Sequence, residues 1–297
     1  MRRGYLIYNA VAGRRRSDSW AQDVIGRARA AGLTLLPRPT SGPGDATLIA
    51  RRCATDSPDV VVVAGGDGTV GEAATGLLGS PIPLAIIPLG TANVLAREYG
   101  IGPSARRAER YLTSRRTRPL TAWRAANRTS FMWMGVGLDA HVMKNLSPSL
   151  KRRFGRAGIA ITALTEFLRY DFPPIAVEGL DADGNPFAQQ ATFVVASNLK
   201  RYGGDPILSP SADPEDDLLA LTLLTSRSRL ALARFFLDVA LGRTPHSRDV
   251  LRLSARTMTA RSLSAKEVDV QVDGDYIGPT PATIGPIAGR ALIVVPP

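Results

Sequence analysis

The sequence predicts an N-terminal α/β domain with a parallel sheet, followed by a mainly antiparallel β domain with inserted helices. The chain has 297 residues, enough for two domains with separate cores. Apolar β-branched runs alternate with helical patterns up to residue 99, which indicates parallel strands joined by helical crossovers. Beyond Pro119 apolar residues recur mostly at every second position, as in β-strands. We therefore place the two domains at residues 1–118 and 119–297.

Short turns separate the predicted elements of the first domain. The run at residues 60–64 is apolar throughout, as in a parallel strand that is buried on both faces. Ser17 or Asp18 can cap the first helix, and Gly32 can end it. Strands are expected at residues 5–8, 33–38, 60–64 and 82–88, and helices at residues 20–31, 45–55, 71–78 and 94–99.

Gly, Pro, Asn and Asp punctuate the predicted strands of the second domain, a pattern typical of antiparallel sheets. Two helices, at residues 150–170 and 229–241, interrupt these strands. The strands are expected at residues 120–125, 130–137, 175–179, 191–197, 218–224, 268–272 and 291–295.

Composition narrows the classes of partner and chemistry. The formal net charge is +11, and 33 of the 37 basic residues are Arg, so the chain should attract anionic partners. Aromatic residues are not interleaved with the basic ones, which disfavours nucleic acid and leaves anionic lipid or a phosphorylated substrate. Two histidines and one cysteine exclude a His-rich or Cys-ligated metal centre, and Cys53 suits a reducing cytosol. No apolar run approaches the 18 or so residues of a membrane span, so we expect a cytoplasmic protein.

The most informative stretch is the turn that follows the apolar run at residues 60–64. Gly65, Gly66 and Gly68 leave no Cβ between the main chain and a ligand, and the next helix offers free N–H groups to a phosphate. Asp67 would repel a phosphate unless a divalent cation or a proton donor lies between them. The turn therefore predicts a nucleotide phosphate site with a metal ion.

Two other interpretations of the same residues stay open. Thr69 and Glu72 match a capping box, in which Thr69 is the N-cap and Glu72 reaches back to its N–H. Gly66, Gly68 and Gly71 match the dinucleotide fingerprint, but no carboxylate follows at the end of the next strand.

Polar residues follow all four predicted strands of the first domain. Asn9, Thr40, Asp67 and Thr91 each lie in the turn after one strand. Because the carboxyl ends of parallel strands meet at one edge of a sheet, we expect these four turns to surround one crevice.

Four motifs then occur in a fixed order along the chain. They are Asn9-x-x-Ala12-Gly13, Gly65 to Thr69, Pro88-Leu89-Gly90-Thr91-x-Asn93 and Asp273-Gly274-Asp275. In this order they resemble the diacylglycerol kinase catalytic-domain family, which holds soluble bacterial lipid kinases, sphingosine kinases and ceramide kinases. The resemblance implies an NAD kinase-like first domain, ATP bound between the domains, and transfer of phosphate to a lipid hydroxyl. GGDGT alone also occurs in NAD kinases, so an NAD kinase-like or other small-molecule kinase is the rival enzyme.

The resemblance also implies roles for individual residues. Asp273 matches the general base that takes the proton from the lipid hydroxyl. Asp275 is expected to be a neighbour that orients Asp273 or the metal. Asp67 serves catalysis through metal or water contact with the phosphates. An ordinary hairpin turn is the alternative for Asp273-Gly274, since Asp-Gly is a strong turn pair. The matching ATP-binding residues are Asn9, Gly13, Thr40, Gly65, Gly66, Asp67, Gly68, Thr69, Glu72, Thr91 and Asn93.

A second Mg²⁺ site is implied in the acidic loop at residues 210–218. Asp216 matches its carboxylate ligand, and the carbonyl groups of Asp213 and Leu218 would complete it. A solvated acidic loop is the alternative. The chain departs from the family pattern at Ala10, Val94, Asp217, Ala220 and Asp275. Because these departures affect the metal loop and the nucleotide site, a nucleotide- or lipid-binding regulator with impaired catalysis is the non-enzyme alternative.

A lipid substrate requires contact with a bilayer, and the helix predicted at residues 150–170 is suited to it. Its start carries Lys151, Arg152 and Arg153, and its later part is apolar. A basic amphipathic helix can lie on anionic lipid, so we expect peripheral membrane association. A core-packed helix with a solvated basic end is the alternative, and a homodimer is compatible with the sequence.

Overall fold

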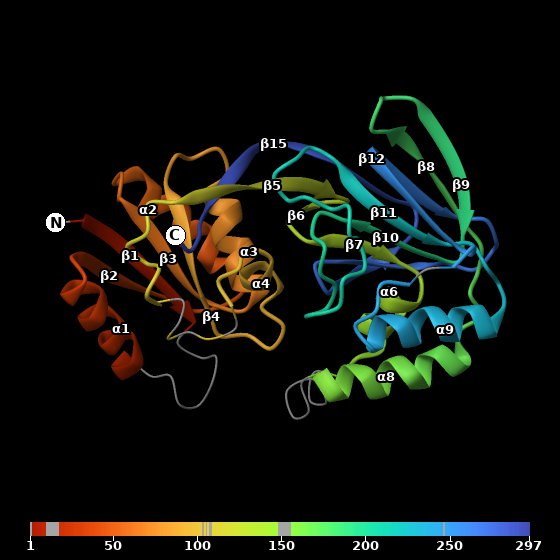
Figure 1. Ribbon diagram of the computed structural model, residues 1–297, viewed down its shortest axis with the longest axis horizontal. Coiled ribbons are helices and arrows are strands. Elements are labelled where there is room, and N and C mark those ends of the chain that lie inside the picture. Colours follow the sequence, from red (N-terminus) through yellow and green to blue (C-terminus); the bar gives the residue numbers. More distant parts are fainter. Residues whose placement is uncertain are drawn as a thin grey trace. The chain divides into compact units, whose positions relative to one another are not determined.

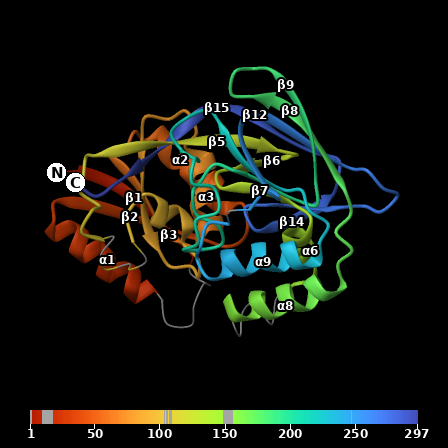
Figure 2. The same cartoon turned by 45° about the vertical axis from the view of Figure 1, so that its right-hand side comes forward.

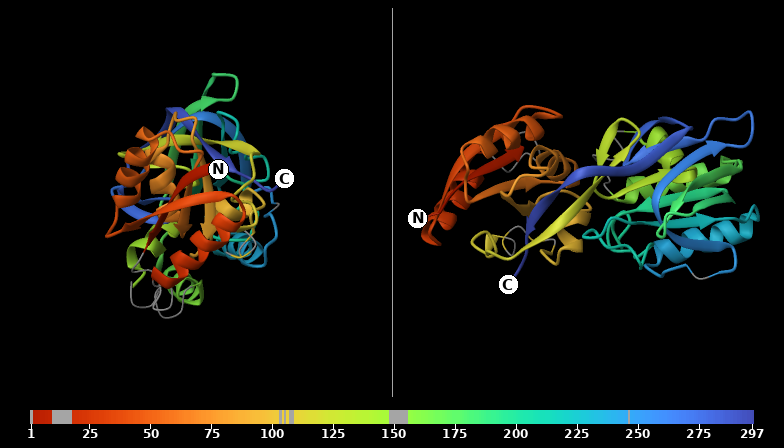
Figure 3. Two further views of the ribbon diagram at one scale, coloured as in Figure 1. Left: turned by 90° about the vertical axis from the view of Figure 1, so that its left-hand side faces the viewer. Right: turned by 90° about the horizontal axis from the view of Figure 1, so that it is seen from above.

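The chain divides into two compact units (Figure 1). The structure is a computed structural model that describes residues 2–9, 18–102, 104, 106, 109–147, 156–245 and 247–297. Unit 1 comprises Met1–Ala122 and Ala288–Pro297, and unit 2 comprises Trp123–Ile287. Strands β5 (Thr117–Ala125) and β15 (Ala282–Val294) carry the chain between the units (Figure 3). The end of the chain therefore belongs to unit 1, whereas the sequence pattern assigns all of residues 119–297 to one domain.

Unit 1 is built on a parallel sheet with the strand order β15-β4-β3-β1-β2. This confirms the predicted α/β domain with a parallel sheet. The pairing of β15 with β4, which aligns Leu292 with Pro83, was not predicted. The other strands are β1 (Arg2–Asn9), β2 (Leu33–Thr40), β3 (Val60–Gly65) and β4 (Pro83–Pro88), and the helices are α1 (Asp18–Ala30), α2 (Asp45–Thr55), α3 (Asp67–Gly76) and α4 (Val94–Glu98).

Helices cover both faces of this sheet, which explains the uninterrupted apolar run of β3. On one face, Leu6 and Val62 pack with Val24 of α1 in a hydrophobic core. On the other face, the Tyr5 hydroxyl donates to the carboxylate of Asp56, the residue that follows α2. Every residue of β3 is buried, as expected for a strand without a solvent-facing side.

Unit 2 contains an antiparallel sheet with the strand order β14-β13-β7-β10-β11-β12-β15. This confirms the mainly antiparallel β domain. The strands are β6 (Arg128–Ser130), β7 (Trp133–Val136), β8 (Ile175–Asp181), β9 (Pro186–Ala191), β10 (Phe193–Ser197), β11 (Leu219–Leu224), β12 (Val250–Ser262), β13 (Asp269–Val272) and β14 (Asp275–Pro279). Strands β9, β12 and β14 and most of β15 were not predicted. Strands β12 and β15 mix partly exposed Arg and Thr with apolar residues and so lack a clear alternation.

The described residues of unit 2 contain the helices α6 (Leu138–Asn145), α8 (Arg156–Arg169) and α9 (Arg229–Ala240). Helix α6 was not predicted. Helices α8 and α9 lie side by side (Figures 1 and 2), with the rings of Phe167 and Phe236 centred 6.0 Å apart. None of the described helices is both long and apolar enough to cross a membrane. Lys151, Arg152 and Arg153 lie outside the described residues.

Candidate active site

The carboxyl ends of four parallel strands form one edge of unit 1, as the sequence predicts. The strand register pairs Asn9 at the end of β1 with Thr40 at the end of β2. It likewise pairs Gly65 at the end of β3 with Pro88 at the end of β4. The residues that end these four strands therefore share one edge, which we call the nucleotide edge. Gly13, another predicted ligand residue, lies outside the described residues.

Two glycine turns approach each other closely on the nucleotide edge. A Cβ added to Gly90 would lie 2.6 Å from the Cα of Gly66, so the two turns can approach this closely only with glycine at position 90. The Gly65 carbonyl also accepts the N–H of Leu89 at 2.8 Å. The side chain of Asn93, which is 6% exposed, closes the second turn by bonding both the N–H and the carbonyl of Gly90. Asn93 thus shapes the turn, while Thr91 is exposed beside it.

The N-terminus of α3 is open at this edge. Gly66 is the N-cap residue and supplies no side-chain cap to the first N–H groups of the helix. Gly68, in the first turn, is exposed, and an added Cβ there would have nothing within 4 Å. An uncapped helix N-terminus with an exposed glycine in its first turn is suited to bind a phosphate group. Thr69 lies against Gly65, where a Cβ would come 2.7 Å from the Thr69 Cβ.

Asp67 begins α3 but directs its carboxylate to another helix. Its Oδ1 accepts the N–H of Leu95 at 3.1 Å, at the start of α4. Burial raises the pKa of Asp67, while the N–H groups of Leu95, Val94 and Asn93 oppose that rise. Asp67 therefore fixes the turn at residues 88–93 relative to α3.

Glu72 fixes α2 relative to α3 in the same way, and the alternative interpretation of Thr69 and Glu72 as a capping box is wrong. Helix α3 starts at Asp67, so Thr69 is not its N-cap. The Glu72 carboxylate instead accepts the N–H of Gly44 at 2.8 Å and that of Ala46 at 3.2 Å. Gly44 is the N-cap residue of α2, so Glu72 caps a neighbouring helix from the side. The local spacing of a capping box could not reveal this long-range partner.

Asp273 lies in unit 2, in the tight turn between β13 and β14. Its backbone φ is 52° and that of Gly274 is 87°, so both residues of this two-residue turn are left-handed. A left-handed conformation is uncommon for a residue other than glycine and persists only when its surroundings enforce it. The hairpin alternative is thus correct for the backbone, but Asp273 is not an ordinary turn residue.

The carboxylate of Asp273 is held by four donors. Oδ1 accepts the hydroxyl of Ser130 at 2.7 Å and the N–H groups of Met132 and Trp133 at 3.1 and 3.0 Å. Oδ2 accepts only the N–H of Phe131 within the described residues, at 2.9 Å. A carboxylate oxygen has two lone pairs, so Oδ2 can accept a further hydrogen bond. Burial raises the pKa of Asp273, against the opposing effect of the four donors.

These contacts explain why the predicted strand at residues 130–137 is broken. The N–H groups of Phe131 and Met132 point to Asp273 instead of to a neighbouring strand, which separates β6 from β7. Nothing in the sequence pattern marked Ser130 and the following peptide groups as partners of a residue so distant in the chain.

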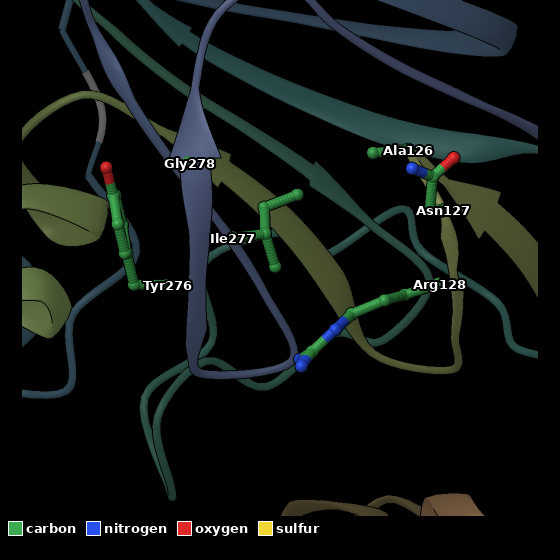
Figure 4. A pocket seen from close by; sticks show the side chains of 6 residues that line it. All are labelled: Ala126, Asn127, Arg128, Tyr276, Ile277 and Gly278. Carbon is green, nitrogen blue, oxygen red and sulfur yellow. The ribbon is translucent and has the colours of Figure 1, made fainter.

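Asp275 faces solvent on the other side of the same turn. Its carboxylate pairs with Arg128 at 3.1 Å, and both side chains are more than half exposed. Arg128 also borders a pocket of about 420 Å³ (Figure 4), lined by Ala126, Asn127, Arg128, Tyr276, Ile277 and Gly278. Within the described residues, no hydrogen bond joins Asp275 to Asp273. The predicted role of Asp275 in orienting Asp273 is therefore not supported by a direct contact.

Comparison with known proteins decides the family. The family model described as "Diacylglycerol kinase catalytic domain" matches residues 3–125. A second, described as "YegS C-terminal NAD kinase beta sandwich-like domain", matches residues 133–296, more than half of the chain. The chain belongs to the diacylglycerol kinase catalytic-domain family.

Individual relatives agree with this assignment. A "Diacylglycerol kinase" of Mycobacterium tuberculosis (strain CDC 1551 / Oshkosh) is 27% identical over 98% of this chain and 94% of its own length. A "Probable lipid kinase YegS-like" of Pseudomonas aeruginosa (strain UCBPP-PA14) is 29% identical over 94% of this chain and 87% of its own. A crystal structure of a candidate diacylglycerol kinase from Bacillus anthracis str. Sterne superposes with a TM-score of 0.81 and 25% identity, covering 100% of this chain and 96% of that one. Because it belongs to this family, the chain is a lipid kinase.

The second metal site that the resemblance implies for the acidic loop of this lipid kinase stays a prediction. The Oδ1 of Asp216 accepts the N–H of Leu218 at 2.9 Å, and the carbonyl of Asp213 accepts the N–H of Asp216 at 3.2 Å. Ala220, where the family usually has Asp, is buried within β11. In the part of the chain that the structure describes, no group of three or more His, Cys, Asp or Glu side chains is arranged so that it could hold a metal ion. The loop closes on its own hydrogen bonds, and we derive no chemical step from a metal there.

Proposed function

We propose that this lipid kinase uses ATP and transfers its γ-phosphate to the hydroxyl of diacylglycerol or a related lipid. The observation that carries this proposal is the environment of the Asp273 carboxylate. This carboxylate is partly buried, burial raises its pKa, and its Oδ2 has a lone pair left for one more donor. A base of raised pKa that can accept a hydroxyl proton is what phosphorylation of an alcohol requires. The names of the relatives favour diacylglycerol as the acceptor.

The nucleotide edge supports ATP as the phosphate donor. The open N-terminus of α3 offers backbone N–H groups and a positive helix dipole to the phosphates. Asp67 and Glu72 turn their charges toward the N-termini of α4 and α2, so neither carboxylate opposes a phosphate in front of α3. Gly66 and Gly90 keep side chains out of the space between the two turns. Magnesium, if it enters with ATP, would neutralise charge on the phosphates.

The proposed reaction needs one base and a held phosphate. Asp273 Oδ2 accepts the proton as the lipid O–H bond breaks. The lipid oxygen forms a bond to the γ-phosphorus, and the bond from that phosphorus to the bridging oxygen breaks, which releases ADP. Such transfers pass through a loose transition state, so the protein contributes mainly position and charge stabilisation.

We also propose that α8 and α9 rest on an anionic membrane. Ile161, Leu164 and Leu168 form one stripe on α8 and are 56, 66 and 66% exposed. Leu230, Leu237 and Leu241 form a second stripe on and just after α9, at 80, 57 and 56% exposure. We call these six residues the leucine stripes. Exposed apolar stripes of this kind are typical of interaction sites.

Charge around the leucine stripes favours lipid over a second protein as their partner. Arg169, Arg234 and Arg243 are exposed on or just after the same two helices. Leucine side chains can insert among acyl chains while neighbouring arginines meet anionic headgroups. This placement would give a peripheral enzyme access to a substrate that stays in the bilayer.

The decisive experiment offers radiolabelled γ-phosphate from ATP to a panel of acceptors. Diacylglycerol, monoacylglycerol, sphingosine, ceramide and NAD are each presented, the lipids in mixed vesicles. We expect label in a lipid and none in NAD. Label in NAD alone would make the protein an NAD kinase, and label in no acceptor, with ATP still bound, would make it a regulator.

A further inference from the structure

Gln271 connects the turn of Asp273 to the interior of unit 2. It lies two residues before Asp273 on β13, and its side chain is buried at 1% exposure. Its Oε1 accepts the N–H of Gly274 at 2.8 Å, and its Nε2 donates to Oδ2 of Asp139 at 3.0 Å. One side-chain amide thus joins the second residue of the turn to the first turn of α6.

Asp139 determines which way this amide points. Its Oδ2 accepts the NH₂ group of Gln271, which leaves the amide carbonyl to accept the N–H of Gly274. The hydroxyl of Tyr202 donates to the same Oδ2 at 2.5 Å. Burial raises the pKa of Asp139, and these two donors oppose the rise. With the amide reversed, NH₂ would meet the Gly274 N–H, and Gly274 would lose its acceptor.

The network also needs a glycine on the neighbouring strand. Gly135 of β7 pairs with Gln271, and a Cβ added to it would lie 1.9 Å from Oδ2 of Asp139 and 2.6 Å from Nε2 of Gln271. The space that holds Asp139 and Gln271 together therefore exists only without a side chain at this position.

The backbone conformation of the turn explains why the hydrogen bond between Gln271 and Gly274 matters for Asp273. Asp273 is left-handed at φ 52°, a conformation that costs free energy and requires support from its surroundings. The four donors hold its carboxylate, whereas Gln271 holds the next peptide group. A shift of that peptide would move Oδ2, the oxygen that we assign to the hydroxyl proton.

We propose that Gln271 is a positioning residue for phosphoryl transfer, which fixes the turn of Asp273 through the Gly274 N–H, with its amide oriented by Asp139. The inference rests on the proposed function, because it needs Asp273 as the base. Gln271 touches no substrate in this account and acts only through the turn.

A kinetic double-mutant cycle between Gln271→Met and Asp273→Asn tests the inference. Methionine retains the bulk of glutamine but neither hydrogen bond. Misplacing a reacting group by about 1 Å can cost on the order of 100-fold, so we expect kcat to fall by about 10- to 100-fold in Gln271→Met, with an unchanged KM for ATP. In the Asp273→Asn background, where no base remains to be positioned, Gln271→Met should change kcat by less than about twofold.

Thr192→Val is the matched control for loss of a buried hydrogen bond in unit 2. The Thr192 hydroxyl donates to the carbonyls of Leu224 and Ser226, away from the turn. We expect this variant to lower the melting temperature while kcat stays near that of wild type. Equal fractional losses from Gln271→Met in both backgrounds would show a general structural effect and overturn the inference. A wild-type kcat in Gln271→Met would also overturn it.

An exchange of donor and acceptor tests the role of Asp139. Gln271→Glu keeps an acceptor for Gly274 but sets two carboxylates against each other, so kcat should fall. Adding Asp139→Asn returns one amide and one carboxylate to the pair, and kcat should recover at least about tenfold over Gln271→Glu. Failure to recover, with both variants folded by thermal melting, would contradict the role of Asp139. A wild-type protein without kinase activity would instead refute the proposed function itself.

Discussion

The Oδ1 atom of Asp67 lies 3.1 Å from the backbone nitrogen of Leu95 and accepts its hydrogen bond. This contact joins the first residue of α3 to the start of α4. Glu72, further along α3, binds the N–H of Gly44 at the start of α2. Helix α3 therefore holds the turns on either side of it, and its own N-terminus stays open to a phosphate.

Asp67→Ala should weaken ATP binding through the turn at residues 88–93. Loss of the bond to Leu95 removes a helix cap, worth about 1 kcal/mol of unfolding free energy. We expect ATP affinity to fall by about tenfold, because the second turn loses its position relative to α3. Denaturant unfolding and titration with ATP measure the two effects.

Asp59→Ala is the control for Asp67→Ala. The Asp59 carboxylate accepts the N–H of Arg3 at 2.8 Å, at the amino end of the strands. A similar loss of stability with unchanged ATP affinity is expected for this variant. ATP affinity within twofold of wild type in Asp67→Ala would remove the turn at residues 88–93 from the nucleotide site.

Gly68→Ala should change stability and ATP affinity in opposite directions. Alanine is favoured over glycine in a helix by about 1 kcal/mol, and the added Cβ meets nothing within 4 Å. The fold should therefore become more stable. If phosphates lie in front of α3, the same methyl group occupies their space, and ATP affinity should fall. A variant that is more stable and binds ATP as tightly as wild type would mean that the phosphates bind elsewhere.

Strand patterns and the nucleotide turn could be predicted from the sequence because they are local. Residues 60–64 show burial on both faces, and the glycines of the next turn show a close backbone approach. The partners of Asp67, Glu72 and Asp273 could not be predicted, since each binds peptide groups distant in the chain. Peptide N–H groups belong to every residue type, so no sequence motif marks them as ligands.

Gln271 is a weak indication in the sequence of the polar network behind the Asp273 turn. It is the one amide side chain in the otherwise apolar or acidic strand β13. A buried amide must find hydrogen-bond partners, which points to a polar network behind the turn. Its partner Asp139 lies in α6, a helix whose short length and mixed composition gave no recognisable period.

The leucine stripes should bind anionic vesicles. Replacing Leu164 and Leu168 by Ser removes two exposed apolar side chains, each worth about 1.5–3 kcal/mol when fully buried. We expect at least about a tenfold loss of affinity for phosphatidylglycerol-containing vesicles in a sedimentation assay. Binding by wild type should weaken as salt rises, because the arginine contribution is screened.

Leu48→Ser provides the matched control for the leucine stripes. Leu48 is 54% exposed but lies on α2 in unit 1. Vesicle binding should be unaffected by this change. If the Leu164 and Leu168 variant binds vesicles as wild type does but elutes as a smaller species in gel filtration, the stripes are an interface between copies of the chain.

The activity should show an acid limb set by Asp273. Burial raises the pKa of this carboxyl, so it becomes a competent base only as the pH rises through that raised value. The same shift has the opposite sign for stability: the contribution of Asp273 is full below its unfolded pKa and is lost as the pH rises through its folded pKa. The pH profile of kcat, at saturating ATP, should therefore rise from acid toward neutral pH. An unchanged limb in Asp273→Asn would assign the titration to another group.

The most direct test of the account is kcat for phosphate transfer to lipid in Asp273→Asn, measured together with ATP affinity. The substitution keeps the size of the side chain and, with its oxygen in place of Oδ1, the acceptor for Ser130, Met132 and Trp133. Its NH₂ group replaces Oδ2, so it loses the bond from the Phe131 N–H and cannot take a proton as a base. General-base catalysis contributes roughly 10²- to 10⁴-fold, so we predict a fall in kcat of that order with ATP affinity within about twofold of wild type. A kcat close to wild type, or a large loss of ATP binding, would contradict the assignment of Asp273 as the base.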